Sequence, residues 1–225
     1  MSKKRKPLAR RVAKLEKLNK KQQKSRGHKE VVASALVTTA APLLVTFQSQ
    51  QGNSPGQYRQ SEAFAQTGIF DYWILANSRS ANYNSNALRV IIGFIRHGAK
   101  SISASTVLND LFGTSSPALN AQYSVRHSWA NEGLGSKYII KFDKMHTWNP
   151  GNYFDGTLTQ TNPYNKDHRR VISFKNVKME WDTASHASLS NPEYNCPFML
   201  VFTANATGIN CNYQYRQWFT DEACA

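Results

Sequence analysis

Residues 88–97, LRVIIGFIRH, are apolar on both sides of an extended chain. Successive side chains of a strand point to opposite faces of a sheet, so a strand with one face in water alternates apolar and polar residues. Val90, Ile91 and Ile92 break that alternation, and residues 197–204 (PFMLVFTA) are likewise apolar on both sides. Both segments therefore predict strands buried on both faces, with neighbouring elements or other subunits covering the second face.

Other runs rich in β-branched and aromatic residues surround these two strands and are separated by Gly, Pro, Asn and Ser. Four of them predict further strands: residues 68–76, 137–145, 170–181 and 212–221. Long, irregular segments join the runs, and helices do not alternate with them as a parallel sheet would require. The pattern predicts an all-β fold and favours a jelly roll or another Greek-key sandwich over a simple meander.

Two details of these strands can be anticipated from their side chains. Tyr138, Ile140 and Phe142 alternate with Lys137, Lys141 and Asp143, which predicts a half-buried strand with these three apolar residues on one face. The apolar phase slips between Phe174 and Val177, which indicates a bulge or bend at that point of the chain.

One helix is predicted in the body, over about residues 105–112, with Ser103 or Ser105 as its N-cap and Gly113 at its end. Gly93 lies inside a predicted strand, where glycine allows a neighbouring chain to approach closely. The stretch that begins at this glycine misses the phosphate-binding loop pattern by one residue. Its first glycine also lies within a strand rather than after it, so nucleotide binding is not expected.

Residues 1–30 hold 13 of the 28 basic side chains and only two acids, Glu16 and Glu30, and so carry +11 of the net charge of +14. The remaining 195 residues hold 15 bases and 12 acids. A basic arm of this kind binds polyanions because it releases their counterions, and the binding is salt-sensitive and nearly independent of sequence. We therefore expect residues 1–30 to be a nucleic-acid-binding arm.

Apolar residues within the arm recur at steps of four, three and three and form one stripe on a helix: Leu8, Val12, Leu15 and Leu18. Pro7 at the first helical position and Gly27 as a stop predict a helix over about residues 8–25 once phosphate neutralises its lysines. The bases expected to contact nucleic acid are Lys3, Lys4, Arg5, Lys6, Arg10, Arg11, Lys14, Lys17, Lys20, Lys21, Lys24 and Arg26.

The cluster Lys3–Lys6, with Arg10 and Arg11, also matches a nuclear localisation signal. No secretory leader is expected, because no apolar core follows the charged N-terminus. The most apolar run, residues 31–45, is too short to span a bilayer and contains Pro42, so it predicts a buried or interface strand pair.

Little in the chain points to catalysis or to a bound metal. Cys196, Cys211 and Cys224 lack CxxC spacing and predict free thiols in a reducing compartment, the first two packed in the core. The six histidines have no ligand spacing. We assign no catalytic residue, metal site or cofactor and expect no enzyme activity. The one alternative to a chain without metal is that Asp155 and Asp221 help to bind calcium at a subunit contact.

The tryptophans admit two interpretations, as stacking platforms for bases or as residues of the core and of subunit interfaces. They are Trp73, Trp129, Trp148, Trp181 and Trp218. Positions in strands favour core or interface residues, and Trp148 and Tyr153 are the best candidates for exposed contacts.

Several segments follow one another in an order that is typical of one family. After the basic arm come Gln57-Tyr58-Arg59, 88–96 (LRVIIGFIR), 106–112 (TVLNDLF), Gln122-Tyr123, 137–144 (KYIIKFDK) and 215–221 (YRQWFTD). The chain thereby resembles the single jelly-roll capsid proteins of small circular single-stranded DNA viruses, which are related to satellite RNA virus capsids. It departs from them at His97, where that family usually has Asp, in its Lys-rich arm, and over residues 31–56, which have no counterpart.

The resemblance implies an eight-stranded jelly-roll shell domain over residues 57–225. With the basic arm over 1–30, residues 31–56 are left as a connecting strand or linker region. The resemblance also implies sixty copies in a T=1 icosahedral shell, with the arm inside on a single-stranded genome. The protein would then be found in the virion and, during assembly, in the host nucleus and cytoplasm. The nuclear signal favours DNA over RNA as the genome.

Two other classes of protein would fit parts of the pattern. A monomeric basic nuclear module with a β-sandwich body would bind nucleic acid through the same arm, but would behave as one species of 25.4 kDa. An enzyme acting on nucleic acid would need acids clustered in a cleft, and none can be recognised in the sequence.

Overall fold

Eight strands and one helix make up the part of the chain that the computed structural model describes, which is residues 26–38, 40–49, 57, 62–78, 87–113, 137–147, 159–181, 190–203 and 209–220. The elements are β1 (Arg26–Val37), β2 (Leu43–Thr46), β3 (Glu62–Ser78), β4 (Ala87–His97), α2 (Ala104–Phe112), β5 (Tyr138–Thr147), β6 (Thr159–Glu180), β7 (Tyr194–Thr203) and β8 (Ile209–Thr220). The prediction of an all-β fold is confirmed. β6 begins earlier than the predicted strand over 170–181, since residues 159–169 also form strand.

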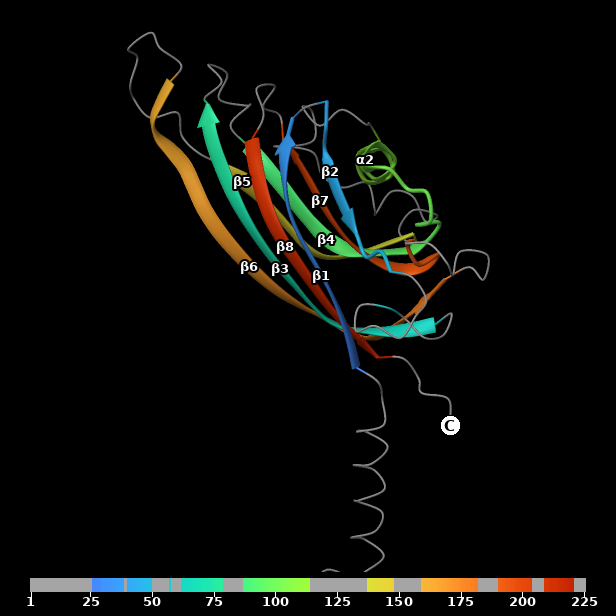
Figure 1. Cartoon of the computed structure of the whole chain (residues 1–225). Coiled ribbons are helices and arrows are strands. Elements are labelled where there is room, and N and C mark those ends of the chain that lie inside the picture. The colour runs from blue at the N-terminus through green and yellow to red at the C-terminus, as the bar shows by residue number, and fades with distance from the viewer. Residues whose placement is uncertain are drawn as a thin grey trace, which may run out of the picture.

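All strand pairs are antiparallel, and four of them are nested: β1 pairs with β8, β2 with β7, β3 with β6 and β4 with β5. β8 also pairs with β3, and β4 with β7. The strands therefore form two groups of four, in the orders β1-β8-β3-β6 and β2-β7-β4-β5, joined by the single pair Glu180↔Tyr194. In Figure 1, β1, β8, β3 and β6 run side by side as one strongly curved layer.

Aromatic side chains fill the space between the two groups of strands. Phe70 of β3 stacks on Tyr215 of β8, with ring centroids 4.4 Å apart. Phe174 of β6 meets Phe94 of β4 at the same separation, 4.4 Å. All four side chains are buried. Because Phe94 and Phe174 belong to different groups of strands, this contact places the core between the two layers.

The second face of β4 and β7 is covered by α2 of the same chain. Val107, Leu108, Leu111 and Phe112 of the helix are buried, and the Phe112 ring lies 5.6 Å from that of Phe202 on β7. Figure 1 shows the helix beside this layer. Burial of both strand faces, as the sequence predicts, is thus achieved within one subunit, and no partner subunit is needed to explain it.

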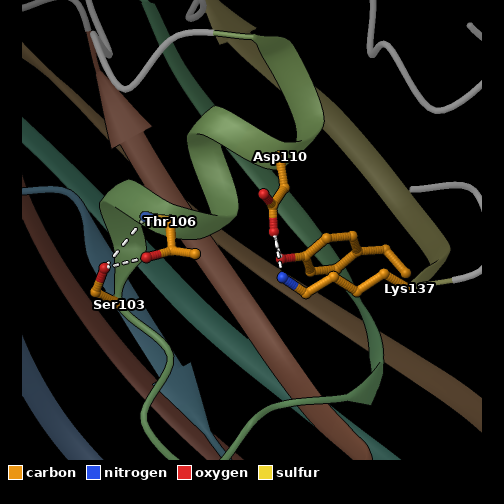
Figure 2. A network of polar contacts seen from close by, with 5 residues as sticks. Ser103, Thr106, Asp110 and Lys137 are labelled. Carbon is orange, nitrogen blue, oxygen red and sulfur yellow. Dashed lines mark hydrogen bonds and ion pairs between the residues drawn. The ribbon is translucent and has the colours of Figure 1, made fainter. Parts of the chain in front are cut away.

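Side chains at both ends of α2 fix its position. Ser103 is the N-cap, and its hydroxyl accepts a hydrogen bond from the Thr106 amide at 3.1 Å. Gly113 ends the helix in the left-handed conformation, with φ of 75°. Figure 2 shows the Asp110 carboxylate turned toward the start of β5, where it accepts hydrogen bonds from Lys137 Nζ and Tyr138 Oη, each at 2.6 Å. Of the two predicted N-caps, Ser103 is correct.

A bulge in β5 separates residues that we predicted to share one face. Ile92 pairs with Phe142 but the next residue, Gly93, pairs with Ile140, so Lys141 is an extra residue on β5. Ile92 and Gly93 point to opposite faces, and so must their partners. Ile140 therefore faces the α2 side and Phe142 the space between the layers. The prediction of one common face is wrong because alternation cannot reveal an inserted residue.

The predicted irregularity between Phe174 and Val177 is confirmed. Ala65 pairs with Val177 and Thr67 with Ser173, so β6 gains residues relative to β3 across this step. Lys175 in the middle has φ of 52°, a left-handed conformation that ends the regular pleat locally.

Gly93 allows close approach of β5, as the sequence predicts: a Cβ atom there would lie 2.2 Å from the Ile139 carbonyl oxygen. Gly93→Ala should therefore force the two strands apart and lower the free energy of unfolding of the full chain by about 3 kcal/mol or more, measured by denaturant titration. Gly98→Ala is the control, because nothing lies within 4 Å of that position and only its φ of +74° is unfavourable, at about 1–2 kcal/mol. Equal losses in the two variants would contradict the close-approach role.

Candidate interface at the base of the basic arm

Eleven of the twelve bases predicted to contact nucleic acid, Lys3 to Lys24, lie outside the described residues, and so does the predicted helix over 8–25. Arg26, the twelfth, is the first residue of β1. The structure therefore describes the base of the arm and the sheet that it enters.

β1 anchors the arm to the last described strand of the chain. It pairs with β8 over all of its 12 residues, from Arg26↔Thr220 to Val37↔Ile209. The last five residues of the segment predicted as the arm, 26–30, are thus part of the sheet. β1 is also an edge strand, with β8 on one side and no strand of the described chain on the other. The basic segment passes directly into the edge of a layer.

The outer face of the β1-β8-β3-β6 layer, hereafter the outer face, exposes apolar side chains. Strand register places them on the side away from the aromatic core: Val32 (70% exposed), Leu36 (56%), Trp73 (36%) and Val171 (62%). A shallow hollow of about 610 Å³ lies among Val32, Ser34, Asp71, Trp73, Arg169 and Asn212. Exposed apolar residues grouped on one face of a layer are typical of surfaces that meet other proteins.

The charges on this face are largely paired with one another. Arg216 Nη2 lies 2.9 Å from Glu30 Oε1, and this hydrogen bond and charge raise the pKa of the Arg216 guanidinium. Gln214 donates a second hydrogen bond to Glu30. Arg169 Nε lies 3.6 Å from Asp71 Oδ1. Among its described side chains the outer face therefore lacks the excess of cations that a nucleic-acid-binding surface needs, and it is better suited to protein than to a polyanion.

The tryptophans divide between the core and the outer face. Trp181 is buried and donates a hydrogen bond from Nε1 to the Ser190 carbonyl at 3.2 Å, so the core assignment is confirmed for it. Trp73 is exposed on the outer face, and Trp218 is half-buried with the Arg216 guanidinium 5.7 Å from its ring. The other aromatic candidates, Trp129, Trp148 and Tyr153, lie outside the described residues.

No group of three or more His, Cys, Asp or Glu side chains in the described ranges could hold a metal ion. Asp155 and Asp221 lie outside those ranges. Among the helices that the structure describes, none is long and apolar enough to cross a membrane.

One pair of residues that the fold brings together, His146 and His168, could not be predicted from any sequence signal. They are separated by 21 residues of chain and belong to no motif. Both lie just outside the predicted strands 137–145 and 170–181. Their ring centroids come to 4.2 Å only because the edges of β5 and β6, which share no backbone pairing in the described chain, face each other.

No protein-family model matches the sequence, and no curated protein matches it. Function is therefore inferred from the charge distribution, the strand pairing and the exposed surfaces.

The two cysteines that are described, Cys196 and Cys211, are free and buried, and burial raises the pKa of both thiols to about 12. Because the thiolate is the reactive form, neither should react with iodoacetamide at pH 8 in the folded protein. The full chain with Cys224→Ser leaves only these two thiols, and intact-mass measurement should find no adduct until denaturant is added, then two. An adduct formed on the folded variant at the rate of a free thiol would contradict their burial.

Proposed function

We propose that this chain is a viral capsid protein that self-assembles into a small T=1 shell of sixty copies and packages single-stranded nucleic acid, with circular DNA favoured. The observation that carries the proposal is the charge partition: +11 in residues 1–30 and near neutrality in the rest. An arm of this charge needs a polyanion partner, whereas the body offers no comparable excess of cations.

The nested strand pairs support an eight-stranded jelly roll as the shell domain. Pairing of β1 with β8, β2 with β7, β3 with β6 and β4 with β5 is what a long hairpin of strand pairs produces when it folds over on itself. A jelly roll formed in this way has two four-stranded sheets with Greek-key connections, and the two observed groups of four strands are compatible with it.

The position of the base of the arm is compatible with an arm that points into the shell and binds the genome there. Residues 1–25 precede β1 directly, so a chain fixed by the β1–β8 pairing holds its arm at one defined edge of the domain. Sixty arms of +11 would bring about 660 positive charges together, enough to neutralise a sizeable part of a genome on the order of one to two thousand nucleotides.

Contact with a second copy of this chain is best supported on the outer face. Its exposed apolar residues, Val32, Leu36, Trp73 and Val171, lie beside ion pairs that cancel much of the local charge. Two copies can meet there without the repulsion that a net charge of +14 would otherwise cause. The sequence pointed to β4 and β7 as possible subunit contacts, but α2 already covers them. We therefore propose that assembly uses the outer face instead.

The cluster Lys3–Lys6 with Arg10 and Arg11 would also direct nuclear import, which is why DNA is favoured over RNA. A satellite RNA virus coat protein is the alternative within the same class. A monomeric nuclear nucleic-acid-binding module is the alternative outside it, and it would use the arm without forming particles.

Deletion of residues 1–25 should abolish packaging while leaving the body folded. This boundary keeps every β1–β8 pair, and it removes eleven bases and one acid. Particles of the deleted chain should contain at least about tenfold less nucleic acid per subunit than particles of the full chain, measured by absorbance and phosphate analysis after nuclease treatment.

The matched control keeps the charge and removes the apolar stripe by changing Leu8, Val12, Leu15 and Leu18 to Ser. If charge drives packaging, this variant should retain most of its nucleic acid. Equal packaging by the deleted and full chains would refute the role of the arm.

Binding by dissociated subunits should depend steeply on salt. Neutralisation of about ten phosphates by residues 1–25 predicts a slope of about −7 in a plot of log binding constant against log salt, for single-stranded oligonucleotides of any sequence. The deleted chain should give a slope near zero. A shallow slope for the full chain, or a strong preference for one sequence, would indicate base readout instead.

A further inference from the structure

Two histidines meet where the edges of the two layers face each other. His146 of β5 and His168 of β6 have ring centroids 4.2 Å apart, and Tyr72 of β3 lies against both, with its ring 5.1 Å from that of His168. Tyr72 Oη is 3.1 Å from His146 Nε2, and His146 is only 3% exposed. β5 and β6 are the last strands of their layers and share no backbone pairing in the described chain. The three side chains thus bridge two edges that backbone hydrogen bonds do not join.

We call Tyr72, His146 and His168 together the histidine latch. The polar groups around it are cations and a phenol. Arg170, two residues along β6, lies with its guanidinium 4.9 Å over the Phe142 ring of β5, and Lys144 is on the same face of β5 as His146. Lys166 is the next residue on that face of β6, and Tyr213 of β8 pairs opposite Tyr72. β4 contributes only uncharged residues, Leu88 and Val90, opposite His146 and Lys144.

The acids nearest to the latch point elsewhere. Asp167 and Asp71 lie on the outer face, and Asp143 is bound to Arg89 at 2.7 Å on the other side of β5. In addition, Nε2 of His168 and Nε of Arg170 are buried without a hydrogen-bond partner in the described part of the chain. A proton added here would meet cations and no carboxylate to balance it.

This setting keeps the histidines neutral near neutral pH. Burial above all, and then the charges of His168, Lys144 and Arg170, lower the pKa of His146 to about 3. Burial and the same two cations also lower the pKa of His168, against a smaller opposing effect of Asp167. A protonated imidazole carries N–H on both nitrogens, so a charged His146 can only donate at Nε2 to the Tyr72 hydroxyl, and it adds a positive charge beside Lys144 and Arg170.

We propose that Tyr72, His146 and His168 form an acid-sensitive latch, which holds the β5 and β6 edges together while both histidines are neutral and releases them on acidification. The latch is a property of the folded body, independent of the capsid proposal. The pKa of His146 is lower in the folded than in the unfolded chain, so the folded state binds fewer protons below about pH 6.5. The stabilisation is therefore complete above pH 6.5 and is lost as the pH falls toward 3.

The test is denaturant unfolding of the full chain at pH 7.5, 6 and 5, before most carboxylates titrate. If His146 stays neutral in the folded chain, the unfolding equilibrium constant should rise about thirtyfold from pH 7.5 to 5. A neutral His168 in the folded chain should increase this rise further. The double variant His146→Gln and His168→Gln keeps polar side chains and removes the titration, so its rise should be much smaller. His97→Gln, at an exposed histidine of β4, should leave the full rise intact.

Histidine hydrogen–deuterium exchange, read by mass spectrometry on the unmodified chain, gives a second readout if the double variant does not fold. No inflection should occur between pH 7.5 and 5 for His146. Amide exchange at pH 5, corrected for intrinsic rates, should reveal loss of protection in β5 and β6 before β1 and β8. A rise undiminished in a folded double variant, an inflection of His146 near pH 6.5, or loss of protection first in β1 would each overturn the latch.

Discussion

The structure depends on removing both faces of β4 and β7 from water. One face of these two strands packs on the other layer, where Phe94 meets Phe174. The opposite face packs under α2, where Phe112 meets Phe202. Neither strand could be stable as the edge or surface of a single sheet. The second layer buries one face of these strands and the helix buries the other. The Asp110 contacts with Lys137 and Tyr138 hold the helix in place (Figure 2).

This core leaves the other layer free to carry the contacts with partners. β1 lies at its edge, receives the basic arm at Arg26 and is fixed along its full length by β8 (Figure 1). The outer face of the same layer bears exposed apolar residues and paired charges. In the function that we propose, the polyanion is bound by the arm and neighbouring copies by the sheet, so the two tasks do not compete for one surface.

Local patterns were enough to predict the strands around Ile91 and Leu200, the capped helix after Ser103, the irregularity after Phe174 and the close approach at Gly93. Each depends on residues near in sequence. The bulge at Lys141 could not be predicted, because an inserted residue leaves the composition of the strand unchanged. The His146–His168 contact was also missed, since it follows from which strands become edges. The sequence could not separate core from interface at Trp73, since its exposure depends on which face of the layer stays uncovered. The sequence did not decide whether a neighbouring element or another subunit covers the second face of β4. In the structure, α2 of the same chain covers it.

Sedimentation of the purified full-length protein, combined with electron microscopy, tests the central claim most directly. Sixty copies of a 25.4 kDa chain would form uniform particles of about 1.5 MDa plus their nucleic acid. We expect such particles, with nucleic acid that nuclease cannot reach until the shell is opened. A protein that stays a single species of 25.4 kDa at every concentration and salt, with or without added single-stranded nucleic acid, would contradict the proposal.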